Sequence, residues 1–160
     1  MSPEAFLANA LEPALKLLPA PMDSAGARAM VVAICLQESR LKHRRQVGGP
    51  ARGYGQFELG GGVRGVLTHP ATRQPIQVVL TCLDYDPTSS AEECWAIIEH
   101  NDILAAAFCR LLLWTLPGAL PARADAADGW RQYIDAWRPG KPHRGTWDAF
   151  YAQAWDIVAK

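Results

Sequence analysis

Residues 29–37 read AMVVAICLQ, and this apolar stretch decides the fold. Its side chains are apolar on nearly every face of a helix, which is typical of a helix buried inside a protein. Asp23 or Ser24 is suited to cap its start, so we expect a buried helix from there to about Ser39. Glu38 is the first ionisable side chain after the stretch and lies at the expected C-terminal end of this helix.

The rest of the chain also favours helices, with no internal repeat and no linker. Ser2 and Pro3 suit the start of a first helix, which we expect Pro13 to kink or shorten. Residues 90–93, Ser-Ala-Glu-Glu, fit a capping box that begins a long helix. We predict helices over residues 75–83, 90–115, 125–137 and about 147–158.

Glycine marks a different kind of segment at residues 44–65, which hold eight of the thirteen glycines. Glycine permits tight turns, so this segment is predicted to be a loop or a short β-hairpin. Any strands should be confined to it. The expected fold class is therefore mainly α, in one domain over residues 1–160 with a single core.

Composition excludes several classes of protein. Sixteen basic residues balance sixteen acidic ones, which argues against a general nucleic-acid binder. The apolar stretch 103–116 contains Arg110 and is too short for a stable membrane span. The start of the chain has no basic segment typical of a secretory signal.

The cysteines and histidines are scattered, so we expect no metal site and no cofactor. No CxxC pair occurs among the four cysteines, which suit buried thiols in apolar helices. The sequence does not decide whether Cys82 and Cys94 form a disulfide bond.

Glu38 has the chemistry of a general acid if its proton is retained near neutral pH. Apolar surroundings and the negative end of the helix dipole both disfavour the charged form. A protonated carboxyl is what the cleavage of a glycosidic bond requires. The alternative is a structural ion pair with Arg40, Arg44 or Arg45.

Three motifs in order resemble those of the lytic transglycosylases of the lysozyme-like superfamily. The family has a buried helix ending in Glu-Ser, then a glycine-rich segment ending in Gly-Leu-Met-Gln, then Ala-Tyr-Asn-Ala-Gly at a helix end. This chain has Glu38-Ser39, then GYGQ at residues 53–56, then AWRPG at residues 136–140. The resemblance covers roughly residues 27–158 and implies a lysozyme-like helical domain with the glycine-rich segment beside its cleft.

The resemblance implies roles for individual residues. Glu38 would be the catalytic acid and then the base, and Gln56 would hydrogen-bond sugar. Tyr54 and Gly55 would line the cleft, with glycine letting the glycan approach the backbone. Ser39 would support the catalytic carboxylate or the loop.

The third motif departs from the family pattern. Trp137 replaces the family's tyrosine and offers only an N–H donor, while Arg138 replaces its asparagine. Tyr133 lies one helical turn before Trp137, so it is expected to supply the missing hydroxyl. Trp130 or Trp137 is also a candidate for stacking on a sugar, whereas Trp147 and Trp155 follow the periodicity of a core.

Glycoside hydrolases usually use two carboxylates, and Glu58, Asp84 and Asp86 are the candidates for a second one. Lytic transglycosylases need only one, because the 6-hydroxyl of the substrate attacks and leaves a 1,6-anhydro end.

Six basic residues lie between positions 40 and 52. They would attract an anionic cell wall, or they simply belong to a solvent-exposed loop. Residues 99–102, Glu-His-Asn-Asp, are expected on the exposed face of a long helix.

The sequence thus predicts an enzyme that cleaves the glycan strands of bacterial peptidoglycan, by lytic transglycosylation. The alternatives are a hydrolytic muramidase, a non-catalytic lysozyme-like module of a phage virion or secretion apparatus, and a helical adaptor without a cleft. We expect synthesis in the cytoplasm and action on the wall after holin-dependent release or injection, or as part of a virion.

Overall fold

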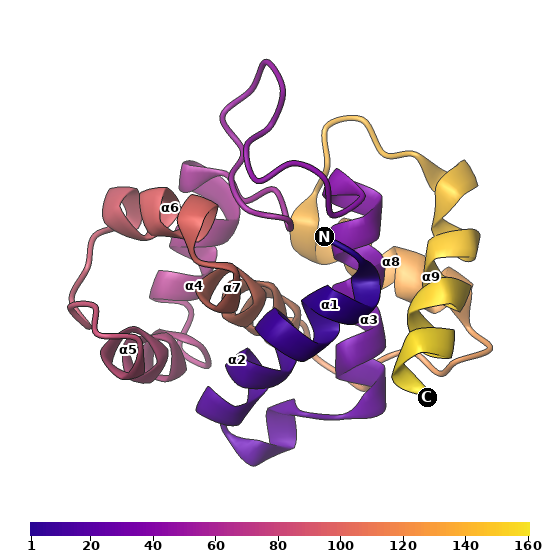
Figure 1. Cartoon of the computed structure of the whole chain (residues 1–160), viewed down its shortest axis with the longest axis horizontal. Helices are drawn as coiled ribbons and strands as arrows, with labels where there is room; N and C mark the ends of the chain where they lie inside the picture. The colour runs from indigo at the N-terminus through magenta and orange to yellow at the C-terminus, as the bar shows by residue number, and fades with distance from the viewer.

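The computed structural model describes residues 1–160 and is mainly helical, as predicted (Figure 1). It contains no β-sheet, only isolated bridges that join Arg52 to Arg45 and to Phe57. Short π-helical turns cover Leu7–Leu11 and Leu59–Val63, and a 3₁₀ turn covers Ala20–Met22. The α-helices are α1 (Pro3–Phe6), α2 (Glu12–Leu17), α3 (Ala25–Ser39), α4 (Arg64–Thr68), α5 (Arg73–Cys82), α6 (Ala91–His100), α7 (Asp102–Trp114), α8 (Ala126–Trp137) and α9 (Arg144–Val158).

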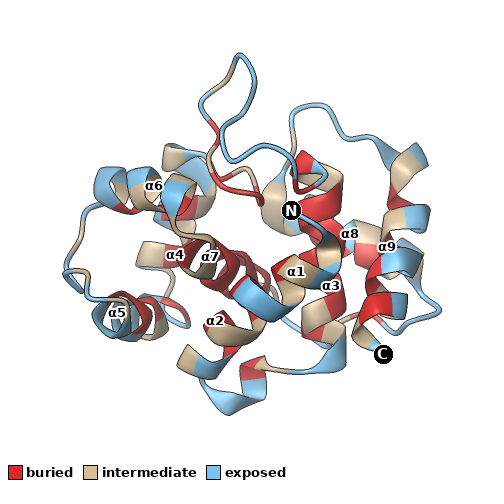
Figure 2. Ribbon diagram, viewed as in Figure 1, coloured by how far each residue is buried: buried red, intermediate tan, exposed pale blue.

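The predicted buried helix is α3, and its predicted bounds are confirmed. The Ser24 side chain caps its first turn by accepting a hydrogen bond from the Ala27 amide at 3.0 Å. Arg40 ends the helix in the left-handed conformation, with φ of 53°. Residues 29–36 are all buried, and α3 packs along α9 on the right side of Figure 2. The C-terminal half of α3 is thereby packed within the core.

Helix α7 is the second buried helix and lies centrally among the remaining ones. Residues 104–113 are all buried, and α7 contacts α2, α3, α4, α5, α6 and α8. One cluster of 38 buried residues includes side chains from α3, α7 and α9. The predicted packing role of Trp147 is confirmed, since its side chain is fully buried; Trp155 is only partly buried.

The predicted single helix over residues 90–115 is wrong, because the chain breaks at Asn101. The capping box at Ser90 and Glu93 is confirmed at the start of α6. Asn101 then leaves the helical conformation, with φ of −123° and ψ of 99°, and its side chain accepts a hydrogen bond from the Leu104 amide. An asparagine cap gives α7 its own start and direction.

The first helical segment is not shortened by Pro13. A π-helical turn at Leu7–Leu11 lies before Pro13, and the Glu12 amide donates a hydrogen bond to the Leu7 carbonyl. The segment then continues as α2 to Leu17. A wide turn of this kind is a known way for a helix to absorb a local change in hydrogen-bond register.

The glycine-rich segment is irregular only as far as Glu58; from Leu59 onward it is helical, which corrects the predicted loop at its end. A Cβ on Gly53 would lie 2.6 Å from Ile98, and one on Gly55 would lie 2.5 Å from the sulfur of Cys109. These two glycines therefore let the loop pack against α6 and α7. For Gly55, the resemblance implied that the missing side chain lets the glycan approach the backbone; in the structure it makes room for Cys109.

All four cysteines are free, so the bridge between Cys82 and Cys94 is absent. No helix combines the length and the apolar character that crossing a bilayer requires.

Candidate functional site

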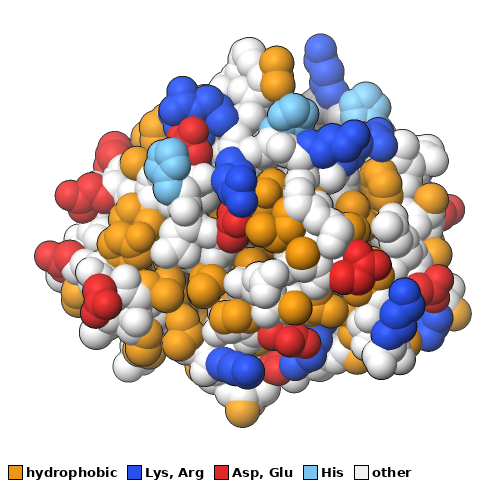
Figure 3. Space-filling model, in the orientation of Figure 1, with side chains coloured by type: hydrophobic (Ala, Val, Ile, Leu, Met, Phe, Trp, Pro, Cys, Tyr) orange, Lys and Arg blue, Asp and Glu red, His pale blue; other side chains and the backbone are white.

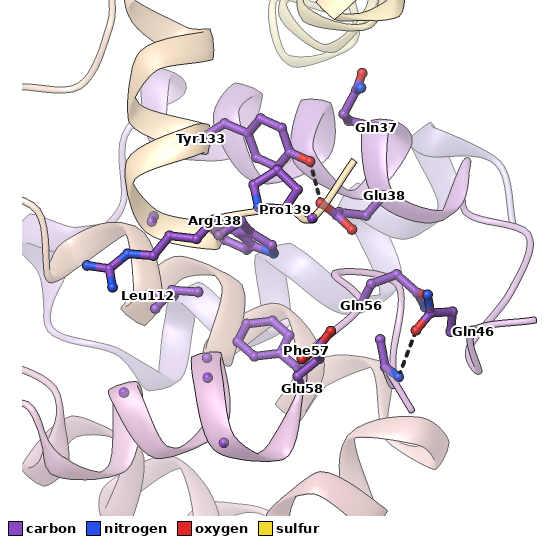
Figure 4. Close-up of a pocket in the computed structure, with 18 of the residues that line it drawn as sticks. Gln37, Glu38, Gln46, Gln56, Phe57, Glu58, Leu112, Tyr133, Arg138 and Pro139 are labelled. Atoms are coloured by element: carbon purple, nitrogen blue, oxygen red, sulfur yellow. Dashed lines mark hydrogen bonds between the residues drawn. The ribbon is translucent and has the colours of Figure 1, made fainter. Parts of the chain in front are cut away.

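The molecule contains a cleft of about 1310 Å³. One wall consists of the glycine-rich loop with the start of α4, and the other consists of the end of α8 with the loop that leads to α9. Glu38 lies between the two walls, at the end of α3 (Figure 4). In Figure 3, Lys, Arg and His side chains gather along the upper edge, where these two loops project.

Tyr133 and Glu38 face each other in the cleft, and the Tyr133 hydroxyl donates a short hydrogen bond to Glu38 Oε1 (Figure 4). They come from α8 and α3, 95 positions apart in the chain. The Tyr133 ring is stacked on Trp147 at 5.3 Å between centroids, with 7° between the ring planes. A buried aromatic stack therefore holds the hydroxyl that points at the carboxyl.

Burial raises the pKa of Glu38 to about 7, from an ordinary 4.5. The hydrogen bond from Tyr133 lowers this pKa, and the negative charge of Glu58 raises it. Burial and the adjacent carboxylate raise the pKa of Tyr133, so its hydroxyl stays protonated and can donate. The site thus holds a carboxyl that keeps its proton to a higher pH than an ordinary glutamate does.

The arginines considered as ion-pair partners for Glu38 lie elsewhere. Arg44 pairs with Asp102 at 2.7 Å, Arg45 pairs with Glu99 at 2.9 Å, and Arg40 lies over the Phe150 ring. Without a cation beside it, the Glu38 carboxyl keeps the raised pKa that burial imposes.

Three arginines of the basic segment between residues 40 and 52 pair with carboxylates of α6 and α7. Besides the two pairs just described, Arg52 pairs with Glu99 and lies over the Trp95 ring. Glu99 and Asp102 are therefore anchors for the glycine-rich loop. The prediction that residues 99–102 mark only an exposed helix face is wrong, because the chain turns at Asn101 and the segment packs against the loop.

Ser39 and Trp137 hold the glycine-rich loop in place through hydrogen bonds to its backbone carbonyls. Ser39 Oγ lies 2.8 Å from the Tyr54 carbonyl oxygen, and the Trp137 indole N–H donates to the Gly55 carbonyl at 2.8 Å. Ser39 and Trp137 also line the cleft, whereas Tyr54 and Gly55 are buried beneath it. The structure therefore does not place Tyr54 and Gly55 on the cleft surface, although the resemblance implied that both would line it.

Gln56 lines the cleft close to Glu38 (Figure 4). Its backbone is left-handed, with φ of 51°, and its side-chain N–H donates to the Gly53 carbonyl at 2.8 Å. This conformation turns the chain from the buried loop into the cleft wall. The side-chain oxygen of Gln56 remains available as an acceptor, since a glutamine amide has both donors and an acceptor.

Among the candidates for a second carboxylate, only Glu58 lines the cleft. It is exposed, and it lies below Glu38 beside Phe57 in Figure 4. Asp84 ends the turn after α5, and the Asp86 carboxylate accepts hydrogen bonds from Thr88, so neither reaches the cleft.

Sequence reasoning missed Gln37, which joins the end of α3 to the loop before α9 and to the start of α9. Its side-chain N–H donates to the His143 carbonyl at 2.9 Å, and its oxygen accepts from the Thr146 hydroxyl at 2.9 Å. The position next to Glu38 at a helix end was the only signal in the sequence that could have indicated Gln37.

Of the two tryptophans predicted to stack on a sugar, Trp130 packs against Tyr133 and Trp147 and does not line the cleft. Trp137 is therefore the one available to a ligand.

Comparison with known proteins finds no matching family model, no matching curated protein and no matching solved structure. Any assignment of function therefore depends on the geometry and chemistry of this cleft.

Proposed function

We propose that this protein cleaves the β-1,4 glycan strands of bacterial peptidoglycan, as a lysozyme-like enzyme with Glu38 as its general acid. The observation that carries the proposal is a carboxyl with a pKa of about 7, bound by Tyr133 inside the cleft. A general acid works best when its pKa is near the working pH. The motif resemblance of residues 38–39, 53–56 and 136–140 supports the same reaction.

In the proposed reaction Glu38 donates its proton to the glycosidic oxygen while the bond from that oxygen to C1 breaks. One part of the glycan leaves as an alcohol, and C1 of the other part becomes electron-poor. The Glu38 carboxylate then takes a proton from the oxygen that attacks C1. In lytic transglycosylation this oxygen is the 6-hydroxyl of the same sugar, and the product has a 1,6-anhydro end.

Tyr133 is proposed to orient Glu38 through its hydrogen bond, replacing the hydroxyl that the third motif lacks. Gln56 and Trp137 would contact the sugars, since both line the cleft. Ser39, Tyr54 and Gly55 would act indirectly by fixing the loop that carries Gln56.

A hydrolytic muramidase is the second candidate, and Glu58 favours it. Its carboxylate lines the same cleft, and its charge contributes to the raised pKa of Glu38. In hydrolysis a second carboxylate activates water or stabilises the positive charge at C1. The product then has a reducing end, which is heavier than the anhydro end by one water.

Purified peptidoglycan provides the test, with release of soluble fragments measured and the fragments weighed by mass spectrometry. We expect anhydro ends from the wild type and at least a hundredfold slower release by Glu38→Gln, the usual lower range for loss of a general acid. Reducing ends that disappear in Glu58→Gln would establish the hydrolytic alternative. If the wild type is folded but releases no fragments, the alternative of a non-catalytic module of a virion or secretion apparatus would be favoured. We also propose that the protein reaches the cell wall by holin-dependent release, by injection or as part of a virion.

A further inference from the structure

Gln37 and Glu38 are neighbours at the end of α3, but their side chains contact two different helices. Successive residues of a helix point about 100° apart, because one turn contains about 3.6 residues. Figure 4 accordingly shows the Gln37 side chain extending away from that of Glu38. Glu38 accepts the hydrogen bond of Tyr133 from α8, whereas the Gln37 amide binds the start of α9. Adjacent residues therefore tie the end of α3 to both helices.

The Gln37 side chain stabilises the first turn of α9. His143, the residue before this helix, gives the turn no side-chain cap. The Gln37 side-chain N–H donates to the His143 carbonyl at 2.9 Å, and the Thr146 hydroxyl lies 2.9 Å from Gln37 Oε1 and 3.1 Å from the same carbonyl. Gly145 also lies in this turn, and glycine is a poor helix former. Gln37 thus supports a helix start that has no cap of its own.

Trp147 follows Thr146 directly and joins α9 to α8. Its indole N–H donates at 2.8 Å to the carbonyl of Ala126, at the start of α8. Its ring is stacked on Tyr133, with 5.3 Å between centroids. Gly129 lets the ring lie close to α8, since a Cβ there would lie 3.2 Å from Trp147 Cζ2. A shift in the first turn of α9 would therefore move the ring on which the Tyr133 phenol is stacked.

These contacts form a closed ring of interactions that includes the Glu38 carboxyl. Gln37 links α3 to α9, and Trp147 links α9 to α8. Tyr133 closes the ring through its hydrogen bond to Glu38 on α3. We propose that Gln37 is a positioning residue, which fixes the first turn of α9 so that Tyr133 stays aligned with Glu38. This inference rests on the proposed function, because a general acid must be held within hydrogen-bond reach of the atom that it protonates.

The test removes the Thr146 hydroxyl rather than Gln37, because Gln37 lines the cleft and Thr146 does not. The variant is Thr146→Val, and Thr146→Ser restores the hydroxyl. The matched control is Thr81→Val, which removes a helix hydroxyl that lies 2.9 Å from the Gln77 carbonyl and outside the cleft. We expect Thr146→Val to lower kcat on peptidoglycan about tenfold with KM unchanged, the upper range for one hydrogen bond. Thr146→Ser and Thr81→Val should keep the wild-type kcat.

A second set of variants shows whether the effect passes through the Tyr133 hydroxyl. Thr146→Val is introduced into the wild type and into Tyr133→Phe, and the two effects on kcat are compared. The proposal expects a loss in the wild type and no further loss in Tyr133→Phe. An equal loss in both backgrounds would mean that Thr146 acts on the fold in general, and it overturns the proposal, as does a wild-type kcat in Thr146→Val.

An NMR titration of the Glu38 carboxyl carbon makes the test independent of cleavage. Burial raises the pKa of Glu38, the hydrogen bond from Tyr133 lowers it, and the charge of Glu58 raises it. Thr146→Val should therefore raise this pKa, in the same direction as Tyr133→Phe, and should add nothing in the Tyr133→Phe background. An unchanged pKa, or an equal rise in both backgrounds, overturns the proposal. If the wild type cleaves no peptidoglycan, the proposed function fails, and the titration still decides whether Gln37 aligns Tyr133 with Glu38.

Discussion

Replacing Glu38 with Gln should reveal an unusual dependence of stability on pH. Burial raises the pKa of Glu38 to about 7 in the folded protein, against 4.5 ordinarily. Between these two pH values the folded state keeps a proton that the unfolded chain has lost. The free energy of unfolding of the wild type should therefore fall by about 1.4 kcal/mol per pH unit relative to the variant.

The magnitude follows from the two pKa values. A change from 4.5 to about 7 corresponds to about 3 kcal/mol in total, a large part of the ~5–15 kcal/mol that stabilises a typical domain. The stabilising contribution of Glu38 is fully present below about pH 4.5. It is lost by about pH 7, above which the difference between wild type and variant is constant. An ion-paired carboxylate would show the opposite sign, since its contribution is lost as the pH falls.

Urea unfolding of both proteins from about pH 4 to about pH 8.5 gives this difference directly. The control is Glu4→Gln, which removes an exposed carboxylate, and its difference from the wild type should stay within about 0.5 kcal/mol. Glu58→Gln should move the midpoint of the Glu38 transition to lower pH, because it removes a negative charge that raises the Glu38 pKa. A wild type that gains stability over Glu38→Gln as the pH rises, or that shows no change, would refute the argument from burial.

Three further substitutions test other parts of the structure. Tyr133→Phe should raise the pKa of Glu38, because the hydroxyl hydrogen bond lowers it; an NMR titration of the glutamate carboxyl carbon that moved down or stayed constant would contradict this. Gly55→Ala should destabilise the protein by about 1–3 kcal/mol, since its Cβ would lie 2.5 Å from a sulfur atom, whereas Gly61→Ala, with open space around it, should not destabilise it in the same urea assay. Asn101→Ala should cost about 1 kcal/mol through loss of the α7 cap, and an unchanged unfolding midpoint would count against that role.

The sequence by itself determined the helical class, the buried helix α3 and the position of Glu38 at its end. These follow from local rules. Residues 29–37 are apolar on nearly every face, and Ser24 caps the helix through an amide three positions away. The capping box at Ser90 is local in the same sense, and it was predicted correctly.

The tertiary structure decided which groups meet Glu38 and which do not. Tyr133 reaches it across 95 positions, while the nearby arginines pair instead with Asp102 and Glu99 on another part of the chain. The same packing places Gly53 and Gly55 in close contact with α6 and α7, whereas Gly55 was expected to line the cleft. Local sequence cannot state such outcomes, because the pKa of a carboxyl depends on the dielectric and the partners that distant residues supply once the core has formed.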